Sequence, residues 1–470
     1  MSIRRLFVLA WMAAGLQVLS AAQTPTPQSP PAQSPGGDAA RTAPAAPLSG
    51  LAGMQIEDSA EDASTTDVPP IPAVLGGKGT SSAFLSELTR SNFLRGGVNV
   101  GAAYDDNPFL LSGAGSNTSE SIFPNIRIEQ STSRTSWSLG YAGGLTVNQR
   151  FTSQNQGSHN LNFDSQFRLS PHVNLRVAEN FSLTTGFFDS GNGAGVVAGS
   201  GGPNASLITP LATQRSSLTT VETNYHFALN DLIGASGSFY DLHFNQRGTQ
   251  VTSPLLDSQT AAGSAFWLHR IFRGDWGGAS YGFQRITYSG SGETRVHSFL
   301  AVNTLSLSRR LTLTGSAGPQ YSENVGATPQ PSNWSVTGAV EGSWRDERTS
   351  VSAGYSRTVS DGGGLLGAVR SQSVHGTFRR ELVPGWAAAV TANHGTNQSV
   401  TGPSTTGTSS INLTSAGVSL ERNVGKSIGL RLGYNHDFQE QFGSPAQTPD
   451  AHRNRFFVTL SYQWAKPLGM

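Results

Sequence analysis

The side chains that could carry chemistry are scattered along this chain and form no recognisable catalytic group. The 470 residues include 10 His and no Cys, which excludes a thiolate metal site and a disulfide framework. His375 and His394 fall on the two strands of one expected hairpin. Strand alternation directs His375 inward, opposite about Asn393, and His394 outward, so the two cannot share a metal ion or a proton. We therefore expect no catalytic residue, no metal site, no cofactor and no enzymatic activity.

A second group of candidates consists of charged side chains that alternation directs into the interior of a barrel. They are Arg127, Glu129, Asp164, Arg168, Arg176, Glu222, Glu341, Arg379 and Arg431. Their signs are mixed, so they fit either the lining of a polar pore or structural pairing across neighbouring strands. The other inward positions are rich in Asn, Gln, Ser and Thr. This composition favours an uncharged, hydroxylated solute over a phosphate, for which clustered Arg or Lys is expected.

The elements that must position these side chains are short amphipathic strands. From Leu94 to Trp464, segments of about ten residues alternate apolar and polar side chains, and this pattern is typical of a transmembrane β-barrel. The clearest segment runs from Trp334 to Trp344, where Val336 and Val340 share a face and Thr337 and Glu341 share the other. We predict an all-β fold, a closed antiparallel barrel of about 18 strands, with 16 to 20 allowed.

The connections alternate between short turns and long Gly/Ser/Thr/Pro-rich loops, as expected for periplasmic turns and extracellular loops. The longest loop is expected from Gly186 to Arg215. Loops of this length are usually functional or disordered. Its apolar stretch from Ala205 to Ala212 predicts that it folds over or into the barrel mouth, and a mobile surface loop is the alternative.

Tryptophan marks one rim of the expected barrel. Six of the 8 Trp fall near a short turn, as amphipathic indole rings do at the headgroup level of a membrane. These residues, Trp137, Trp267, Trp276, Trp344, Trp386 and Trp464, are predicted to form a periplasmic aromatic girdle.

The segment before the barrel has the features of an exported protein. Arg4 and Arg5 precede a short apolar stretch that ends in Ser20-Ala-Ala22, so we predict a signal peptide over residues 1–22. Residues 23–80 are rich in Pro, Ala and Ser and are expected to form a disordered periplasmic leader. Residues 81–93 fit either a short amphipathic helix or a loosely ordered tether. The barrel is expected over residues 94–464.

Two motifs resemble known outer-membrane proteins. Phe456, Val458, Leu460, Tyr462 and Trp464 alternate with polar residues and resemble the C-terminal insertion signal read by the barrel-assembly machinery, although six residues follow Trp464. Gly101-Ala-Ala-Tyr-Asp-Asp-Asn107 resembles the opening strand of barrels associated with bacterial exopolysaccharide biosynthesis and export clusters. This second resemblance implies a role in the passage of a polysaccharide.

Together these observations predict a protein of the cell outer membrane. Only 13% of the residues are charged and the net charge is +1, which argues against a nucleic-acid partner. The expected partners are outer-membrane lipid, the assembly machinery, and a polysaccharide or small polar solute. The leading hypothesis is a passive channel or secretion pore. A structural or adhesive barrel without conductance is the main alternative, followed by a barrel enzyme.

Overall fold

The computed structural model describes thirteen stretches of the chain, from Asn92 to Leu468. They are residues 92–108, 115–151, 155–186, 212–246, 255–272, 274–290, 292–308, 310–325, 330–362, 367–400, 410–425, 427–442 and 451–468. The predicted signal peptide, the leader and most of the predicted helix or tether lie outside these residues. Asn92 and Phe93, at the end of the predicted helix or tether, belong to the first strand.

Eighteen strands make up the described chain, in agreement with the number predicted from alternation. They are β1 (Asn92–Asp105), β2 (Asn117–Ser131), β3 (Thr135–Asn148), β4 (Gln156–Arg168), β5 (Val173–Gly186), β6 (Ala212–Ala228), β7 (Asp231–Gln246), β8 (Ser258–Phe272), β9 (Asp275–Tyr288), β10 (Gly292–Ser306), β11 (Leu311–Val325), β12 (Gln330–Arg345), β13 (Thr349–Ser360), β14 (Val369–Val383), β15 (Trp386–Ser399), β16 (Ser410–Val424), β17 (Ile428–Phe442) and β18 (Ala451–Pro467). Within the described stretches, no helix is long and apolar enough to cross a membrane.

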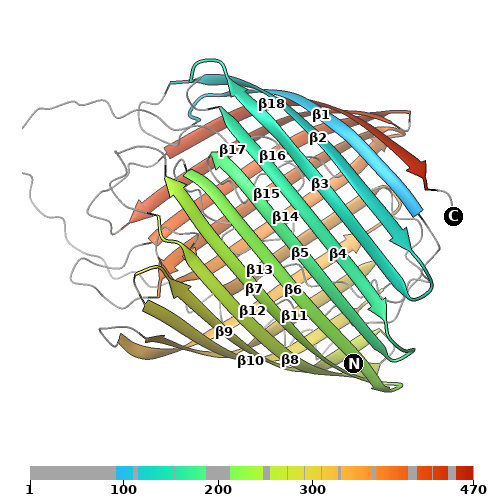
Figure 1. Ribbon diagram of the computed structural model, residues 1–470, viewed down its shortest axis with the longest axis vertical. Helices are drawn as coiled ribbons and strands as arrows, with labels where there is room; N and C mark the ends of the chain where they lie inside the picture. The colour runs from blue at the N-terminus through green and yellow to red at the C-terminus, as the bar shows by residue number, and fades with distance from the viewer. Residues whose placement is uncertain are drawn as a thin grey trace, which may run out of the picture. The chain divides into compact units, whose positions relative to one another are not determined.

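The sheet closes on itself. Each strand pairs antiparallel with the next one along the chain, and β1 also pairs with β18, from Phe93↔Pro467 to Asp105↔Arg455 (Figure 1). Closure satisfies the backbone groups of the first and last strands, which would otherwise form unpaired edges in the membrane. The predicted fold class, a closed antiparallel barrel, is therefore confirmed.

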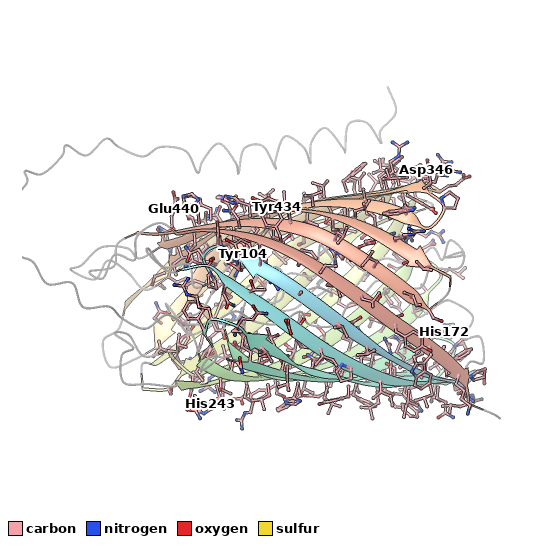
Figure 2. All side chains as sticks on the ribbon, turned by 90° about the horizontal axis from the view of Figure 1, so that it is seen from above. Tyr104, His172, His243, Asp346, Tyr434 and Glu440 are labelled. Carbon is pink, nitrogen blue, oxygen red and sulfur yellow. The ribbon has the colours of Figure 1, made fainter. Side chains whose placement is uncertain are left out.

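The two ends of the barrel differ in their connections. His172 and Asp346 lie in short turns at one end, whereas His243 and Glu440 lie near the ends of strands that lead into long connections at the other (Figure 2). The short turn between β14 and β15 contains Gly385 with a φ of 80°, a conformation that favours glycine. The short-turn end corresponds to the predicted periplasmic side. The long loop predicted from Gly186 to Arg215 is shorter, because Gly186 belongs to β5 and Ala212 to Arg215 belong to β6; residues 187–211 between them lie outside the described residues.

Alternation places apolar residues on the outside of the barrel and small polar residues on the inside. Val340, Leu432 and Leu460 are exposed on the outer face. Thr337 and Ser461 are buried on the inner face, and each is an odd number of residues from Val340 or Leu460 in the same strand. Because the side-chain period is two, the sheet keeps this division as long as its register holds.

One part of the inner wall is apolar rather than polar. Leu232, Phe266, Leu268, Trp276 and Val302, from β7 to β10, form a buried cluster on the inner face. Trp276 is only 4% exposed, so it does not belong to the predicted periplasmic girdle. The prediction used its position near a turn but not its face. In the register of β8 and β9, the exposed Trp267 lies opposite Ala279, which puts the even-numbered Trp276 on the inner face.

Candidate functional site: the barrel lumen and its mouth

All nine charged residues predicted to face inward lie on the inner face of the sheet. Each of them is next in its strand to a residue on the outer face. That neighbour, or its register partner, has an apolar side chain. Examples are Ile126 beside Arg127, Val340 beside Glu341 and Phe378 beside Arg379. Whether these nine side chains line an open pathway stays a prediction.

Most of these residues belong to three ion clusters, which lie in the half of the barrel near the short turns. In the first, Glu129 accepts from Arg95 Nε at 3.1 Å and lies 2.9 Å from Arg127 Nε. In the second, Arg176 Nε donates to Asp164 at 2.8 Å and its Nη1 lies 3.5 Å from Glu222. These contacts join β1 to β2, and β4 to β5 and β6, across the inner face.

The third cluster joins β14, β16 and β17. Arg379 Nη2 donates to Glu421 Oε2 at 2.8 Å, and Arg431 Nε lies 3.6 Å from the other Glu421 oxygen. Arg431 also donates to Ser419 at 3.2 Å. Each arginine of the three clusters therefore has a carboxylate beside it, and the clusters present little unbalanced charge to the lumen.

Two predicted residues lie outside these clusters. Arg168 is exposed at the end of β4, next to a short turn. Glu341 lies on β12, where Gly354 of β13 separates it from His375 of β14. A Cβ on Gly354 would come within 2.6 Å of the His375 ring, so the absence of a side chain there gives the imidazole its space. The register pairs His375 with Asn393, as predicted, and Val374 with His394, so the two histidines are on opposite faces.

Arg95 and Glu421 are cluster members that the sequence analysis did not select. Both occupy inward positions, so alternation alone was sufficient to find them. Gly425-Lys-Ser-Ile-Gly429 was not among the predicted sites, although it has the Gly-x-Ser-x-Gly spacing of a nucleophile elbow. Ser427 lies in the tight turn between two antiparallel strands, not between a strand and a helix, so the match lacks the context of that motif. No group of His, Asp and Glu in the described stretches could hold a metal ion.

The mouth at the opposite end contains a buried ion cluster. Arg453 of β18 is 1% exposed, and its Nε and Nη2 lie 2.9 and 2.6 Å from Asp437 of β17. Asp105 of β1 lies 3.9 Å from Arg453 Nε, and Ser415 of β16 donates to Asp437 at 2.7 Å. This cluster therefore links β16, β17 and β18 with β1, where the sheet closes.

The wall of the barrel changes at the same end, between β12 and β13. These strands share eight register pairs, from Arg345↔Ser350 to Gly338↔Arg357, whereas every other neighbouring pair has at least eleven. Beyond the Gly338↔Arg357 pair, toward the mouth, the Thr337 hydroxyl donates to the Arg357 carbonyl oxygen at 2.6 Å in place of a ladder bond. β13 nevertheless continues to pair with β14 as far as Ser360↔Val369. The upper part of this hairpin has therefore separated from β12.

The end of the hairpin that does not pair with β12 lies inside the lumen. We call it the hairpin tip: Thr358 to Asp361 and Ala368 to Arg370. Val359 and Ala368 pack against Ile286, Tyr288 and Val296, which are inner-face residues of β9 and β10. Ser258 of β8 donates to Asp361 at 2.6 Å, and both residues are about 2% exposed. The hairpin tip therefore occupies part of the mouth.

Two other connections contact this region. The Val400 amide, after β15, donates to the Ala368 carbonyl oxygen at 2.9 Å. Asp257, before β8, accepts from the Phe244 amide at 2.8 Å, and its carbonyl oxygen accepts from the Ser289 amide at 3.1 Å. The mouth is thus narrowed by residues from the β7–β8, β13–β14 and β15–β16 connections. The β5–β6 loop, for which the length and the apolar stretch predict the same role, lies outside the described residues, so its role stays a prediction.

The outer face carries the remaining predicted residues. Trp137, Trp267, Trp344, Trp386 and Trp464 are on this face, near short turns or chain ends, and the girdle stays a prediction for these five. Glu179 also faces outward, opposite Phe163, in an uninterrupted register with β4. Its carboxylate accepts from Ser217 at 2.6 Å and from Thr219, so neighbouring strand hydroxyls compensate its charge.

Comparisons with known proteins find only distant likenesses. No family model matches the chain, and no curated protein does. Similar solved structures include the outer membrane protein OpdK of Pseudomonas aeruginosa, with 12% identity, 79% of this chain and 99% of that one covered, and a TM-score of 0.41. OccAB4 of Acinetobacter baumannii has 9% identity, 81% and 100% coverage, and a TM-score of 0.43. The import receptor Fiu of E. coli K12 has 9% identity, 81% and 82% coverage, and the same TM-score, 0.43.

The physical properties of the barrel itself decide its location. A closed sheet leaves no strand edge at β1 and β18, and the apolar outer face would be unstable in water. The inner face is largely polar, as in barrels that span a membrane. The protein is therefore an outer-membrane β-barrel of 18 antiparallel strands.

Proposed function

We propose that this barrel is a passive channel for uncharged, hydroxylated solutes, including sugars or a polysaccharide chain. The observation that carries the proposal is the neutralised inner wall. Glu129, Asp164, Glu222 and Glu421 each lie beside an inward arginine, so the three clusters offer polar contacts without a strong field of one sign. Barrels of 16 to 18 strands are wide enough for an aqueous channel.

The rest of the lumen supports the same class of solute. Accessible hydroxyl and amide side chains on the inner face, such as Asn162, Asn180 and Ser343, can exchange hydrogen bonds with sugar hydroxyls. A phosphate or other polyanion is disfavoured because each cluster arginine already has a carboxylate partner. The resemblance of Gly101 to Asn107 to exopolysaccharide-associated barrels suggested a polysaccharide, and this stays part of the proposal.

The test is conductance together with solute uptake. The refolded chain in a planar bilayer is expected to give discrete current steps with weak ion selectivity. Liposomes that contain the barrel should swell in neutral sugars faster than liposomes without it, and the rate should fall as the sugar becomes larger. Sugars and sugar phosphates of similar size provide the matched comparison, because only the charge differs.

A folded barrel that passes neither ions nor sugars would contradict the channel proposal and favour a structural or adhesive surface protein. Faster uptake of the sugar phosphate than of the neutral sugar would contradict the proposed solute class. Release of fatty acid from lipid, or of peptide fragments, by the purified barrel would instead identify a barrel enzyme.

A further inference from the structure

An apolar patch interrupts the polar inner wall at the short-turn end of the barrel. It is the buried cluster already described, and we call it the inner-wall cluster: Leu232, Phe266, Leu268, Trp276 and Val302. Leu232 and Trp276 directly follow the first residues of β7 and β9, and the other members lie toward the short-turn ends of β8 and β10. Apolar side chains on the wall of a water-filled lumen are costly, so their burial needs a cause.

The low exposure of the inner-wall cluster requires a covering layer on its lumen side. Leu232 and Leu268 are 1% exposed, whereas Leu432 and Leu460 on the outer face are 46% and 50% exposed. The described members of the cluster, and the half-buried Leu300 that packs against them, all belong to the neighbouring strands β7 to β10. A single wall covers its own side chains only from the sides. The layer over the cluster therefore comes from outside this wall.

A buried polar atom indicates a hydrogen-bond donor in that layer. Asn224 of β6 is 6% exposed, and its Oδ1 has no hydrogen-bond partner among the described residues. Asn224 pairs with Gly234, which pairs with Phe266 of the cluster. A Cβ on Gly234 would touch both the Phe266 ring and Asn224 Oδ1, so the oxygen lies beside the ring. A buried acceptor without a partner is costly, and a backbone N–H in the covering layer would satisfy it.

The chain contains a segment with the composition that this layer needs. Residues 68–75, in the predicted leader and before the described stretches, read Val-Pro-Pro-Ile-Pro-Ala-Val-Leu and carry no charge. Pro69 and Pro72 have the Pro-x-x-Pro spacing of segments that dock on aromatic-lined grooves as a polyproline II helix. This helix has no internal hydrogen bonds, so its amides are available to an acceptor such as Asn224. Phe266 and Trp276 supply the aromatic rings of the groove.

The segment can reach the inner-wall cluster from the start of the first strand. β1 begins at Asn92, at the same short-turn end of the barrel, and β1 and β10 lie on opposite sides of it (Figure 1). Eighteen strands about 4.8 Å apart and tilted by about 40° make a barrel about 35 Å across. The chain between Leu75 and Asn92 spans up to about 55 Å when extended. The long connections, in contrast, start from the opposite end.

We propose that residues 68–75 dock on the inner-wall cluster as an extended segment. Their apolar side chains cover Leu232, Leu268 and Trp276, and one of their backbone amides donates to Asn224 Oδ1. The docked segment narrows the lumen along β7 to β10 and lies away from the three ion clusters. The docking does not rest on the proposed channel function, because it requires no solute and no conductance.

Cross-linking tests the docked position in the full chain. The chain has no Cys, so an introduced pair reports a single contact. Ala73→Cys is combined with Leu300→Cys, beside the cluster, and the protein is refolded in phosphatidylcholine vesicles and oxidised. In the matched control, Ala73→Cys is combined with Ser136→Cys on the inner face of β3, near the same end of the barrel. The first pair should form its disulfide at least about tenfold faster, because docking raises the effective concentration of the two thiols.

Equal rates for the two pairs would describe a leader that moves freely in the lumen, and would overturn the proposal. A second measurement, which needs no disulfide geometry, is the labelling of Leu300→Cys alone by a maleimide. The triple variant Ile71→Ser/Val74→Ser/Leu75→Ser keeps the prolines and the chain length. It should speed the labelling by at least about tenfold, because it removes apolar surface worth more than about 1.4 kcal/mol.

Leu48→Ser/Leu51→Ser is the matched control for labelling, because it removes apolar residues from the same leader outside the docked segment. It should leave the labelling rate unchanged. An unchanged rate in the triple variant would overturn the proposal. Faster labelling only after deletion of residues 191–210 would assign the covering layer to the β5–β6 connection and would also overturn it. Circular dichroism of each variant verifies that the strand content is intact, and conductance tests the channel function separately.

Discussion

The contact between Ser258 and Asp361 offers the most direct test of the narrowed mouth. Ser258→Ala removes a hydroxyl that donates at 2.6 Å to a carboxylate in a site where both residues are about 2% exposed. Loss of a hydrogen bond to a buried charged group costs about 1.5–3 kcal/mol. Since about 1.4 kcal/mol is a factor of ten, the docked hairpin tip should become about ten- to a hundredfold less favoured relative to the released one.

Single-channel recording in a planar bilayer measures this change. If the parent spends most of its time in a smaller-conductance state with the tip docked, Ser258→Ala should raise the occupancy of a larger state in proportion. Asp361→Ala should act in the same direction. The double variant should resemble the single ones because the two side chains form one contact.

Ser264→Ala is the control, since Ser264 is another inner-face serine of β8 and pairs with Ser236 at 2.7 Å, away from the hairpin tip. It should leave the occupancy unchanged. If the parent conducts and the Ser258 and Asp361 variants show its conductance levels and occupancies, the docked tip does not limit the current and our reasoning about the mouth is wrong.

Three further predictions concern other parts of the barrel. Arg176→Ala leaves two carboxylates without their shared partner, so the reversal potential in a salt gradient should shift toward cation selectivity; an unchanged potential would separate Arg176 from the ion path. Trp276→Ala should lower the free energy of unfolding in urea by about 3–5 kcal/mol, more than Trp344→Ala on the outer face, and equal losses would contradict the difference in burial. Thr219→Val removes a donor to Glu179 and should cost about 1–3 kcal/mol in the same assay. Adding Glu179→Leu should recover much of that loss, and a further loss would refute the lipid-facing position.

The sequence was sufficient for the strands and for most of their faces. A strand that is apolar on one side repeats every two residues, so the local pattern gives both its existence and its orientation. This is why Arg127, Asp164 and Arg431 were predicted on the inner face, and why His375 and His394 were separated. The pattern was weaker in β9, where Gly appears on both faces, and there the position of Trp276 near a turn led to the wrong face.

Pairings between strands were decided only by the folded barrel. Arg176 can meet Asp164 and Glu222 because β5 lies between β4 and β6 in one particular register. The sequence alone is compatible with many registers between neighbouring strands and with many ion-pair partners for each charged side chain. The closed sheet selects one, since only that arrangement pairs the backbone of all eighteen strands at once.

The mouth depended most strongly on tertiary structure. The outward apolar series of β13 is interrupted at Arg357 and resumes at Val359, so the local pattern alone does not show that the segment beyond Arg357 leaves β12. The departure reflects a competition between ladder bonds to β12 and the packing of Val359, Ala368 and Asp361 against β8 to β10. Those contacts join residues that are about a hundred positions apart in the chain, as Ser258 and Asp361 are, so no local pattern can contain them.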